Sequence, residues 1–461
     1  MVTRTWRTAV LLTGETALLT TAVALGSYVR LRDDTPVLFM GADGVLRVML
    51  IVVVCQICLH YADLYDLHTI ADTRDLIVRV LQALGATSLI LAVIYFWFPD
   101  WVIGRGVFLI AAVLVITLIL LWRLLFTWLS KNIAPRERLL LVGTNPASIE
   151  LARELFERRQ ELGVEIAGFI DPDPSRVGAP VLNPGVIGTI DDIPALVERL
   201  NIDRVVVSLT DARGRLPMDR LLDIRLKNGV SFDHLASVYE EYTGKIAVEN
   251  LRPSWLIFSS GFRKTRASMA VKRAFDISLS LVGLVVSLPI MALVAAAVKA
   301  TSAGPVLYRQ ERVGLNGHIF TVFKVRTMRQ DAEAATGPVW SLRNDARVTP
   351  IGRFLRRARL DEIPQLWNVL RGEMSFVGPR PERPSFVEQL TAQIPFYGQR
   401  HVVKPGLTGW AQVRYSYGAS VEDAIEKLQY DLYYIKNLSF SLDLVIVLET
   451  IKTVVLRRGG Q

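Results

Sequence analysis

The stretch AFDISLSLVGLVVSLPIMALVAAAVKA, residues 274–300, decides the architecture of this chain. It is long and apolar enough to cross a bilayer, and its only charges, Asp276 and Lys299, lie near its ends. Pro289 interrupts it, and a proline inside a helix removes a backbone hydrogen bond and bends the axis. The sequence therefore predicts a membrane helix with a break near its middle.

Basic residues flank this stretch on both sides. Because arginine and lysine favour the cytoplasmic side of a membrane, both ends of the helix are expected on that side. We therefore predict a re-entrant membrane helix over about residues 272–300, which dips into one leaflet and returns. Ser287 is a candidate partner for the backbone that Pro289 leaves unsatisfied. A plain fifth span, which would place the rest of the chain outside, is the alternative.

Four further apolar stretches precede residue 135, and they cover about residues 9–29, 45–64, 80–98 and 107–129. Each approaches the roughly 20 residues that a spanning helix needs, so region 1–134 is predicted to be a four-helix transmembrane bundle. The N-terminal flank, the second connection and the segment after the fourth stretch carry the larger basic load, which puts both ends of the bundle in the cytoplasm. Glu15 is expected near the headgroups, at a helix end.

The composition agrees with a membrane protein that handles phosphates. Of 461 residues, 51% are hydrophobic, and the formal net charge is +9. That charge suits anionic lipid, phosphate substrates and nucleic acid alike, but the basic residues cluster beside apolar stretches, so no nucleic-acid partner is expected. Cys55 and Cys58 are the only cysteines, which excludes a disulfide framework and a four-cysteine zinc site.

Region 135–260 has a different periodicity. Short β-rich runs at 139–142, 166–170 and 205–209 alternate with amphipathic helical stretches such as 148–162. The opening LLLVGTNPASIELA is a strand, loop and helix, as in dinucleotide-binding folds, but Asn145-Pro146 stands where a close approach to pyrophosphate needs glycine. We predict a degenerate Rossmann-like domain with a structural or regulatory role, and cofactor binding is the alternative.

The densest group of reactive residues lies in RRARLDEIPQLWNVLRGEMSFVGPRPERP, residues 356–384. Asp361-Glu362 comes where a helix is predicted to begin, with Pro364 in its first turn and Gly372 as its cap. The helix N-terminus and the arginines upstream favour ionised carboxylates, as a nucleophilic aspartate or a Mg²⁺-holding pair requires. The alternative is the ordinary acidic bias of a surface helix.

Other segments add groups that suit a phosphate. Gly378-Pro379-Arg380-Pro381 is a stiff loop that presents one guanidinium, whose planar fork matches phosphate oxygens. KPGLTGWAQV, residues 404–413, supplies a cation, a hydroxyl and an amide from Lys404, Thr408 and Gln412. FTVFKVRTM, residues 320–328, places Lys324 and Arg326 on one face of a predicted strand. Together these residues are candidates for binding a uridine diphosphate.

Six segments carry a family resemblance, namely KRAFDISLS, YRQERVG, FKVRTM, RLDEIPQLWNVLRGEMSFVGPRP, KPGLTGWAQV and YDLYYIKNLS. In this order they resemble the motifs of the monotopic bacterial polyprenyl-phosphate sugar-1-phosphate transferases, which initiate capsule, exopolysaccharide and O-antigen assembly. The resemblance covers about residues 268–458, and the N-terminal regions resemble the large, exosortase-associated members. One departure is Ser287-Leu288-Pro289, where several small members carry Ser-Pro.

The resemblance implies an activity and roles for particular residues. The family transfers a sugar-1-phosphate from a UDP-sugar to undecaprenyl phosphate through a covalent phosphosugar intermediate, and UMP leaves. Asp361 would be the nucleophile, with Glu362 assisting it or a Mg²⁺ ion. Arg380 would bind phosphate, and Asp431 would serve the metal or a proton. The predicted metal ligands are therefore Asp361, Glu362 and Asp431, and Lys272 and Arg273 would meet the lipid phosphate.

The implied whole is a membrane protein with a four-helix transmembrane bundle, a Rossmann-like α/β domain, and a mixed α/β catalytic domain, 268–461, that carries the re-entrant helix. The resemblance implies a homodimer in the bacterial inner membrane, with the catalytic domain in the cytoplasm. One rival is an NAD-dependent membrane nucleotide-sugar dehydratase, but the glycine fingerprint is broken and no tyrosine has a lysine four residues later. The other is a non-catalytic scaffold for polysaccharide assembly.

Overall fold

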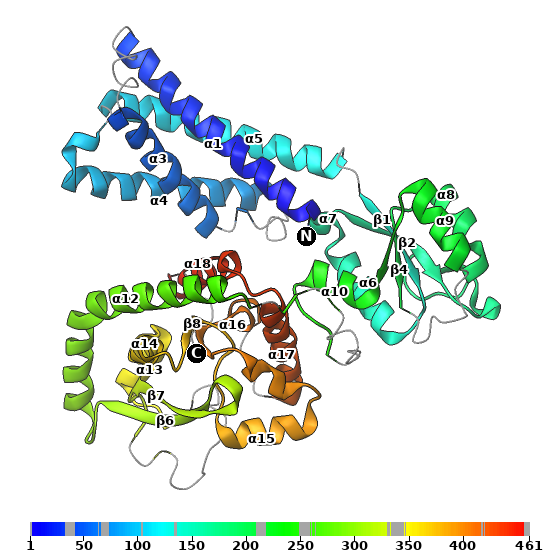
Figure 1. Ribbon diagram of the computed structural model, residues 1–461. Coiled ribbons are helices and arrows are strands. Elements are labelled where there is room, and N and C mark those ends of the chain that lie inside the picture. Colours follow the sequence, from blue (N-terminus) through cyan, green and yellow to red (C-terminus); the bar gives the residue numbers. More distant parts are fainter. Residues whose placement is uncertain are drawn as a thin grey trace. The chain divides into compact units, whose positions relative to one another are not determined.

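The computed structural model divides the chain into two compact units, Met1–Val238 and Tyr239–Gln461 (Figure 1). It describes residues 2–32, 42–62, 64–65, 73–102, 105–132, 136–208, 218–248, 259, 261–262, 264–329, 332, 345, 347–415, 418 and 420–455. The two units divide between residues 238 and 239, whereas the sequence extends the α/β domain to about residue 260. The reason is that Ile246 and Val248 are buried in the core of the second unit.

Long apolar helices open the first unit. Among the described residues before 135 they are α1 (Val2–Leu31), α3 (Ala42–Tyr61), α4 (Thr73–Trp97) and α5 (Arg105–Asn132), and the turn η2 (Pro99–Trp101) follows α4. By length and composition each of the four helices can cross a membrane, over Ala9–Arg30, Asp43–Tyr61, Leu76–Trp97 and Leu109–Phe126. Leu19, Val52, Leu84 and Ile119 pack in a common core, while many other apolar side chains face outward. The predicted apolar stretches therefore form helices close to their expected bounds.

Glu15 has partners within the first unit that the sequence did not reveal. Its carboxylate is fully buried and forms an ion pair with Arg123 of α5, which is also buried. The Tyr65 hydroxyl donates a hydrogen bond to Glu15 Oε2 at 2.5 Å, and the Arg123 guanidinium lies over the Tyr65 ring. A buried carboxylate needs such partners, and a single sequence does not reveal which distant arginine supplies them.

A five-stranded parallel sheet follows the helices. Its strands are β1 (Glu137–Val142), β2 (Val164–Ile170), β3 (Val186–Gly188), β4 (Arg204–Val207) and β5 (Ser231–His234), in the order β3-β2-β1-β4-β5. This is the strand order of the first five strands in doubly wound dinucleotide-binding folds. The predicted strands at 139–142, 166–170 and 205–209 are thus confirmed as β1, β2 and β4, with small differences at their ends.

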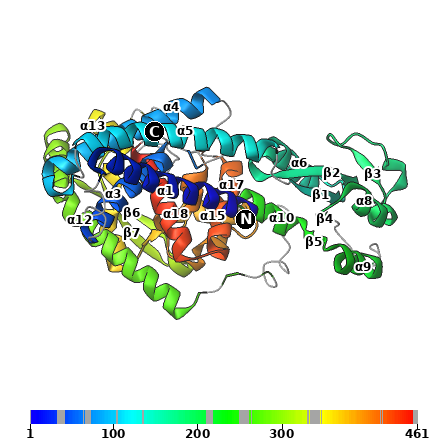
Figure 2. The same cartoon turned by 90° about the horizontal axis from the view of Figure 1, so that it is seen from above.

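Helices lie on both faces of this sheet (Figures 1 and 2). Leu140 and Val142, two residues apart on β1, share a buried cluster with residues of α8 and α9. The helices are α6 (Pro146–Glu157), α7 (Arg159–Leu162), α8 (Ile193–Leu200) and α9 (Met218–Asn228), with the turns η3 (Pro174–Arg176) and η4 (Ile190–Asp192) between strands. The side chain of Asn145 caps α6 by accepting from the Ser148 amide at 2.9 Å. In dinucleotide-binding folds, amides at this helix N-terminus bind a phosphate. Here the Asn145 side chain accepts from the Ser148 amide in place of a phosphate.

The second unit is a mixed α/β domain. Helix α10 (Leu235–Thr243) runs from β5 into it, and α12 (Arg266–Thr301) follows. Its strands are the hairpin β6 (Leu307–Val313) and β7 (Ile319–Val325) and the parallel pair β8 (Ser375–Val377) and β9 (Gly406–Thr408). The remaining elements are η5 (Leu315–Gly317), α13 (Pro350–Arg357), η6 (Leu360–Glu362), α14 (Gln365–Arg371), α15 (Pro384–Gln393), η7 (Tyr397–Val402), α16 (Trp410–Arg414), α17 (Val421–Lys436) and α18 (Phe440–Val455).

Helix α12 has two arms that meet at a bend (Figure 1). Pro289 lies inside the helix, where its missing N–H permits the bend. The Ser287 hydroxyl donates to the carbonyl of Leu284 at 3.2 Å, and not to the carbonyl of Val285, which is the one that Pro289 leaves without its helical donor. The arms carry exposed apolar side chains, among them Val282, Val286, Leu288 and Leu293. By length and composition α12 can also cross a membrane.

Both ends of α12 are fixed to the same unit. Near its start, Lys272 forms a buried ion pair with Asp443 of α18, with Nζ 2.7 Å from Oδ2. Asp276 accepts hydrogen bonds from the Phe376 amide at 2.9 Å and the Ser375 hydroxyl at 3.1 Å. Near its end, Val298 packs in a cluster with residues of β7 and α13. The helix therefore leaves the folded unit and returns to it.

Candidate active site

Asp361 and Glu362 lie in the short 3₁₀ turn η6, between α13 and α14. Arg359 precedes the turn with φ 58°, and this left-handed residue redirects the chain. Pro364 stands at the N-cap of α14 and Gly372, with φ 84°, caps its end. The predicted helix and its glycine cap are confirmed, but Pro364 stands at the N-cap instead of in the first turn, and the carboxylates occupy the turn before the helix.

Three cations surround the carboxylate of Glu362. Arg380 Nη2 lies 2.7 Å from Oε1 and Lys324 Nζ lies 3.5 Å from the same oxygen, while Arg359 Nη1 lies 3.4 Å from Oε2. Burial alone would raise the pKa of Glu362, but these three charges hold it well below its usual value. Glu362 is therefore ionised, and both of its carboxylate oxygens form ion pairs.

Asp361 differs from its neighbour. It is 8% exposed, and its carboxylate makes no hydrogen bond or ion pair with the residues that the structure describes. Burial and, after it, the negative charge of Glu362 raise the pKa of Asp361, although Lys324, Arg356 and Arg380 oppose the rise. The expectation that the local field favours ionisation thus holds for Glu362, whereas the pKa of Asp361 moves in the opposite direction.

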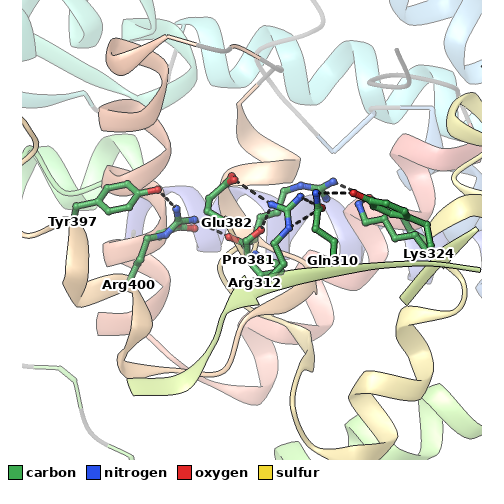
Figure 3. A network of polar contacts seen from close by, with 11 residues as sticks. Gln310, Arg312, Lys324, Pro381, Glu382, Tyr397 and Arg400 are labelled. Carbon is green, nitrogen blue, oxygen red and sulfur yellow. Dashed lines mark hydrogen bonds and ion pairs between the residues drawn. The ribbon is translucent and has the colours of Figure 1, made fainter. Parts of the chain in front are cut away.

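Lys324 and Arg312 extend the positive surface beside the pair (Figure 3). Lys324 comes from β7, and burial lowers its pKa to about 8, although Glu362 opposes this change. Arg312 comes from the neighbouring strand β6, donates to the Pro381 carbonyl at 3.0 Å and pairs with Glu382. A group of cations beside the carboxylate of Asp361, which has no partner among the described residues, suits a substrate with several phosphate charges.

The loop that carries Arg380 is held at the edge of the small parallel sheet. The Gly378 amide donates to the Thr408 carbonyl and the Gly406 amide donates to the Pro379 carbonyl, both at 2.9 Å. A Cβ atom on Gly406 would lie 2.1 Å from the nitrogen of Gly378, so only glycine permits this approach. The KPGLTG segment therefore supports the GPRP loop.

Arg326, Thr408 and Gln412, three other predicted binding residues, have partners within the protein. Arg326 lies just beyond β7 and donates to the carbonyls of Ser302 and Ala303, at the end of α12. Thr408 is buried, with its hydroxyl 2.6 Å from that of Thr450. The Gln412 amide donates to the Leu407 carbonyl at 3.4 Å. Their role in substrate binding therefore stays a prediction.

The predicted lipid-phosphate residues also have protein partners. Lys272 is buried in its ion pair with Asp443, and Arg273 donates to the carbonyls of Val369 and Leu370, at the end of α14, at 2.6 and 2.7 Å. Lys404 is half-buried near Arg273, and burial lowers its pKa. In this structure Lys272 and Arg273 fix α12 to the domain.

The three predicted metal ligands do not come together. Asp431 is 1% exposed and pairs with Arg400, with its Oδ2 2.7 Å from Nη2. Within the described part of the chain, no three His, Cys, Asp or Glu side chains lie close enough to hold a metal ion. Of the three, only Asp361 presents a carboxylate without a partner among the described residues, so these residues do not fit a site of three carboxylates, and Asp361 alone is open to a metal ion.

Two residues of the site were not identified from sequence. Arg312 stood out only as a basic residue after the membrane helix, although it lies in the YRQERVG segment. Arg400 lies four residues before Lys404 and gave no signal, because its burial depends on Tyr397 and on Asp431 of α17, 31 residues away. Both arginines act through tertiary contacts that residue spacing does not reveal.

Two regions of the chain match known protein families. Residues 267–457 match the family model described as bacterial sugar transferase, and residues 60–224 match the model described as CoA-binding domain. The second match overlaps the parallel sheet and the helices before it. The first match contains Asp361, Glu362, Lys324 and Arg380, so the site described above lies within the transferase region.

Relatives of several lengths are similar to this chain. The UDP-N-acetylgalactosamine-undecaprenyl-phosphate N-acetylgalactosaminephosphotransferase of Aeromonas hydrophila is 36% identical over 56% of this chain and 60% of its own length. The UDP-glucose:undecaprenyl-phosphate glucose-1-phosphate transferase of Klebsiella pneumoniae is 35% identical over 68% of this chain and 67% of its own length. The exopolysaccharide production protein PSS of Rhizobium leguminosarum bv. phaseoli is 40% identical over 42% of this chain and 98% of its own length.

The chain thus spans about 60% of the length of the Aeromonas relative and nearly all of the short Rhizobium relative. The family predicted from the six motifs is confirmed by these matches: the chain belongs to the bacterial sugar transferases.

Proposed function

We propose that this chain transfers a sugar-1-phosphate from a UDP-sugar to undecaprenyl phosphate, the initiating step of exopolysaccharide or O-antigen synthesis. One observation carries the proposal: Glu362 is neutralised by three cations, while the adjacent Asp361 makes no hydrogen bond or ion pair with described residues. A carboxylate without a partner beside a positive surface fits attack on a phosphate, because the cations offset the charges of both reactants. The names of the relatives support the same reaction.

The reaction has two half-steps at one phosphorus atom. In the first, an Asp361 oxygen bonds to the β-phosphorus of the UDP-sugar, the bond from that phosphorus to the bridging oxygen breaks, and UMP leaves with the electron pair. In the second, an oxygen of undecaprenyl phosphate bonds to the same phosphorus, and Asp361 leaves as a carboxylate. The products are UMP and undecaprenyl-diphospho-sugar. Two anionic substrates thus use one site in turn.

Arg380, Lys324 and Arg312 are assigned to the phosphate groups. Arg380 and Lys324 both contact Glu362, which holds them beside Asp361 before any substrate binds. Such preorganised charges stabilise the charge that develops on the transferring phosphoryl group and on departing UMP. A Mg²⁺ ion bound by Asp361 and the diphosphate would add further charge compensation. EDTA should abolish UMP release and Mg²⁺ should restore it, and full activity in EDTA would contradict the metal requirement.

The location of the site supports action at a membrane surface. Both arms of α12 are anchored to one folded unit, through Lys272 and Asp276 at the start and Val298 at the end. A helix that leaves and returns to the same unit fits a re-entrant membrane helix better than a plain fifth span. We assign the four N-terminal helices to a transmembrane bundle and the catalytic domain to the cytoplasmic face of the bacterial inner membrane.

The topology is tested by labelling single cysteines from each side of the membrane. Cysteines introduced at exposed Arg309 and Glu388 should both react only with a reagent that reaches the cytoplasm. Labelling of either from the outside would favour a plain fifth span. The proposed homodimer is tested by mass photometry of the detergent-solubilised chain, and a single species of monomer mass would contradict it.

The sugar and the reaction are tested together with a panel of UDP-sugars. The relatives' names include N-acetylgalactosamine and glucose, so both donors belong in the panel with galactose. Purified protein in lipid nanodiscs with undecaprenyl phosphate should release UMP and form a labelled lipid product from at least one donor. Asp361→Asn should lose both, and Glu388→Gln, at an exposed position on α15, should retain them. Equal product from Asp361→Asn would contradict the role of Asp361 as nucleophile, and no UMP release from any donor by the unaltered chain would favour the scaffold.

A further inference from the structure

Arg400 is a buried arginine that the proposed reaction does not use directly. It is 6% exposed, and its guanidinium donates to acceptors from three segments of the chain. Nη1 donates to the Tyr397 hydroxyl at 2.6 Å, and Nη2 donates to Asp431 Oδ2 at 2.7 Å and to the Arg380 carbonyl at 3.0 Å. Burying a guanidinium is costly, and one with three converging acceptors points to a specific role.

The third acceptor is the backbone of the phosphate-binding arginine. We propose that Arg400 is a positioning residue for the transferase reaction, which fixes the backbone of Arg380 so that the Arg380 guanidinium meets Glu362 and the substrate phosphates beside Asp361. This inference rests on the proposed function for its substrate, but its structural claim concerns Arg380 alone. Asp431 then orients Arg400 through a buried ion pair, which gives this carboxylate a role other than metal binding.

Four consecutive residues of the loop each have a backbone group held by a different partner. The Gly378 amide donates to Thr408, and the Pro379 carbonyl accepts from Gly406, as described above. The Arg380 carbonyl accepts from Arg400, and the Pro381 carbonyl accepts from Arg312 Nη1 at 3.0 Å. Two of the four partners, Thr408 and Gly406, act through their backbone. The other two act through their side chains, and both are arginines. Figure 3 shows Arg400 and Arg312 on the two sides of Pro381 and Glu382.

A fixed backbone matters because the side chain of Arg380 is only partly buried, at 36% exposure. A long flexible side chain samples many rotamers, and anchoring its main chain limits the positions that the guanidinium can reach. A displacement of about 1 Å at a phosphate-binding group can reduce a rate on the order of 100-fold. Arg400 therefore affects the reaction through Arg380 and without contact with substrate.

The Tyr397 hydroxyl is another acceptor of the Arg400 guanidinium, and it accepts from Nη1. Tyr397 is 2% exposed, and the Arg400 guanidinium also lies over its ring, 5.1 Å from the centroid. Arg400→Lys keeps the positive charge for Asp431, but one ammonium cannot reproduce the planar fork that reaches three acceptors. Arg400→Lys thus keeps the compensation of the buried Asp431 charge but removes the hydrogen bond to the Arg380 backbone.

The test is a double-mutant cycle in the full-length chain with Arg380→Ala and Arg400→Lys. Arg400→Lys should lower kcat/KM for UMP release on the order of 10- to 100-fold, and in the Arg380→Ala background it should change the remaining rate less than about 3-fold. Arg309→Lys, at an exposed position on β6, is the matched control and should leave the rate unchanged. Equal losses in both backgrounds would mean a general structural role and would overturn the proposal.

A second measurement keeps the inference separate from the proposed function. Binding of inorganic pyrophosphate to the purified chain is measured by calorimetry for the same four proteins of the cycle. Arg400→Lys should weaken binding only where Arg380 is present, and unchanged binding would overturn the proposal. If no UDP-sugar releases UMP, the proposed function fails while the pyrophosphate cycle still decides the role of Arg400. If Arg400→Lys does not fold, Tyr397→Phe carries the same cycle with a smaller expected loss.

Discussion

Arg380 Nη2 lies 2.7 Å from Glu362 Oε1, so the GPRP loop and the turn η6 are joined by a charged contact. Lys324 reaches the same oxygen and Arg359 the other one. Glu362 is therefore the centre of the positive group, and Asp361 stands beside it without a partner among the described residues. This arrangement assigns different roles to two adjacent carboxylates.

Glu362→Gln should separate these roles. The amide preserves size but removes the charge that gathers Arg380, Lys324 and Arg359, so these cations are expected to move and repel one another. We expect kcat/KM for UMP release to fall by at least about 100-fold, the scale for a misplaced binding group. Stopped-flow or endpoint UMP assays measure the loss, with Glu388→Gln as the control. Activity within 3-fold of wild type, on the order of a single weak surface contact, would show that Glu362 does not organise the site.

Lys324 should impose an alkaline limit on the reaction. Burial lowers its pKa to about 8, so its positive charge is lost as the pH rises through 8, and phosphate binding weakens above that value. An exposed lysine would keep its charge to a pH near its ordinary pKa of about 10.4. The pH profile of kcat/KM should therefore fall above about pH 8.

Lys324→Arg is the matched variant, because a guanidinium stays protonated throughout this range. Its profile should lose the alkaline limb even if its maximum is lower. A limb at the same pH in both proteins would show that a different group titrates.

The buried Glu15–Arg123 pair should contribute to the stability of the N-terminal helices. Removing one partner leaves a buried charge uncompensated, so Arg123→Gln is expected to lower the free energy of unfolding by about 3–5 kcal/mol. Glu15→Gln with Arg123→Gln should be less destabilising than either single change. Denaturant titration of the solubilised chain measures these values, and a double variant that loses the sum of both single losses would contradict an interacting pair.

Much of the architecture could be predicted from sequence because its signals are local. The apolar runs before residue 135 became α1, α3, α4 and α5, and Pro289 marked the helix that bends. The parallel sheet followed from alternating strand and helix patterns. The two compact units divide about 20 residues before the expected end of the α/β domain, because Ile246 and Val248 belong to a core formed by much later segments.

The candidate site was predicted only in part. Motifs brought Asp361, Glu362, Lys324 and Arg380 together correctly, since each lies in a segment of strong local character. Arg326 was assigned to the same face as Lys324 by the two-residue period of a strand, but β7 ends at Val325, and the side chain turns to the end of α12. Lys272 pairs with Asp443, 171 residues away, and Asp431 pairs with Arg400, 31 residues away, and no periodicity applies over such separations.

The central claim is that Asp361 forms a covalent bond to phosphorus before the lipid acceptor binds. Intact-protein and peptide mass spectrometry should be applied to the purified chain after rapid quenching with a UDP-sugar and no undecaprenyl phosphate. We predict a phosphosugar adduct on Asp361, released UMP in equal amount, and loss of the adduct when undecaprenyl phosphate is added. Release of UMP together with lipid product, and no adduct at any time before the lipid is added, would contradict the claim.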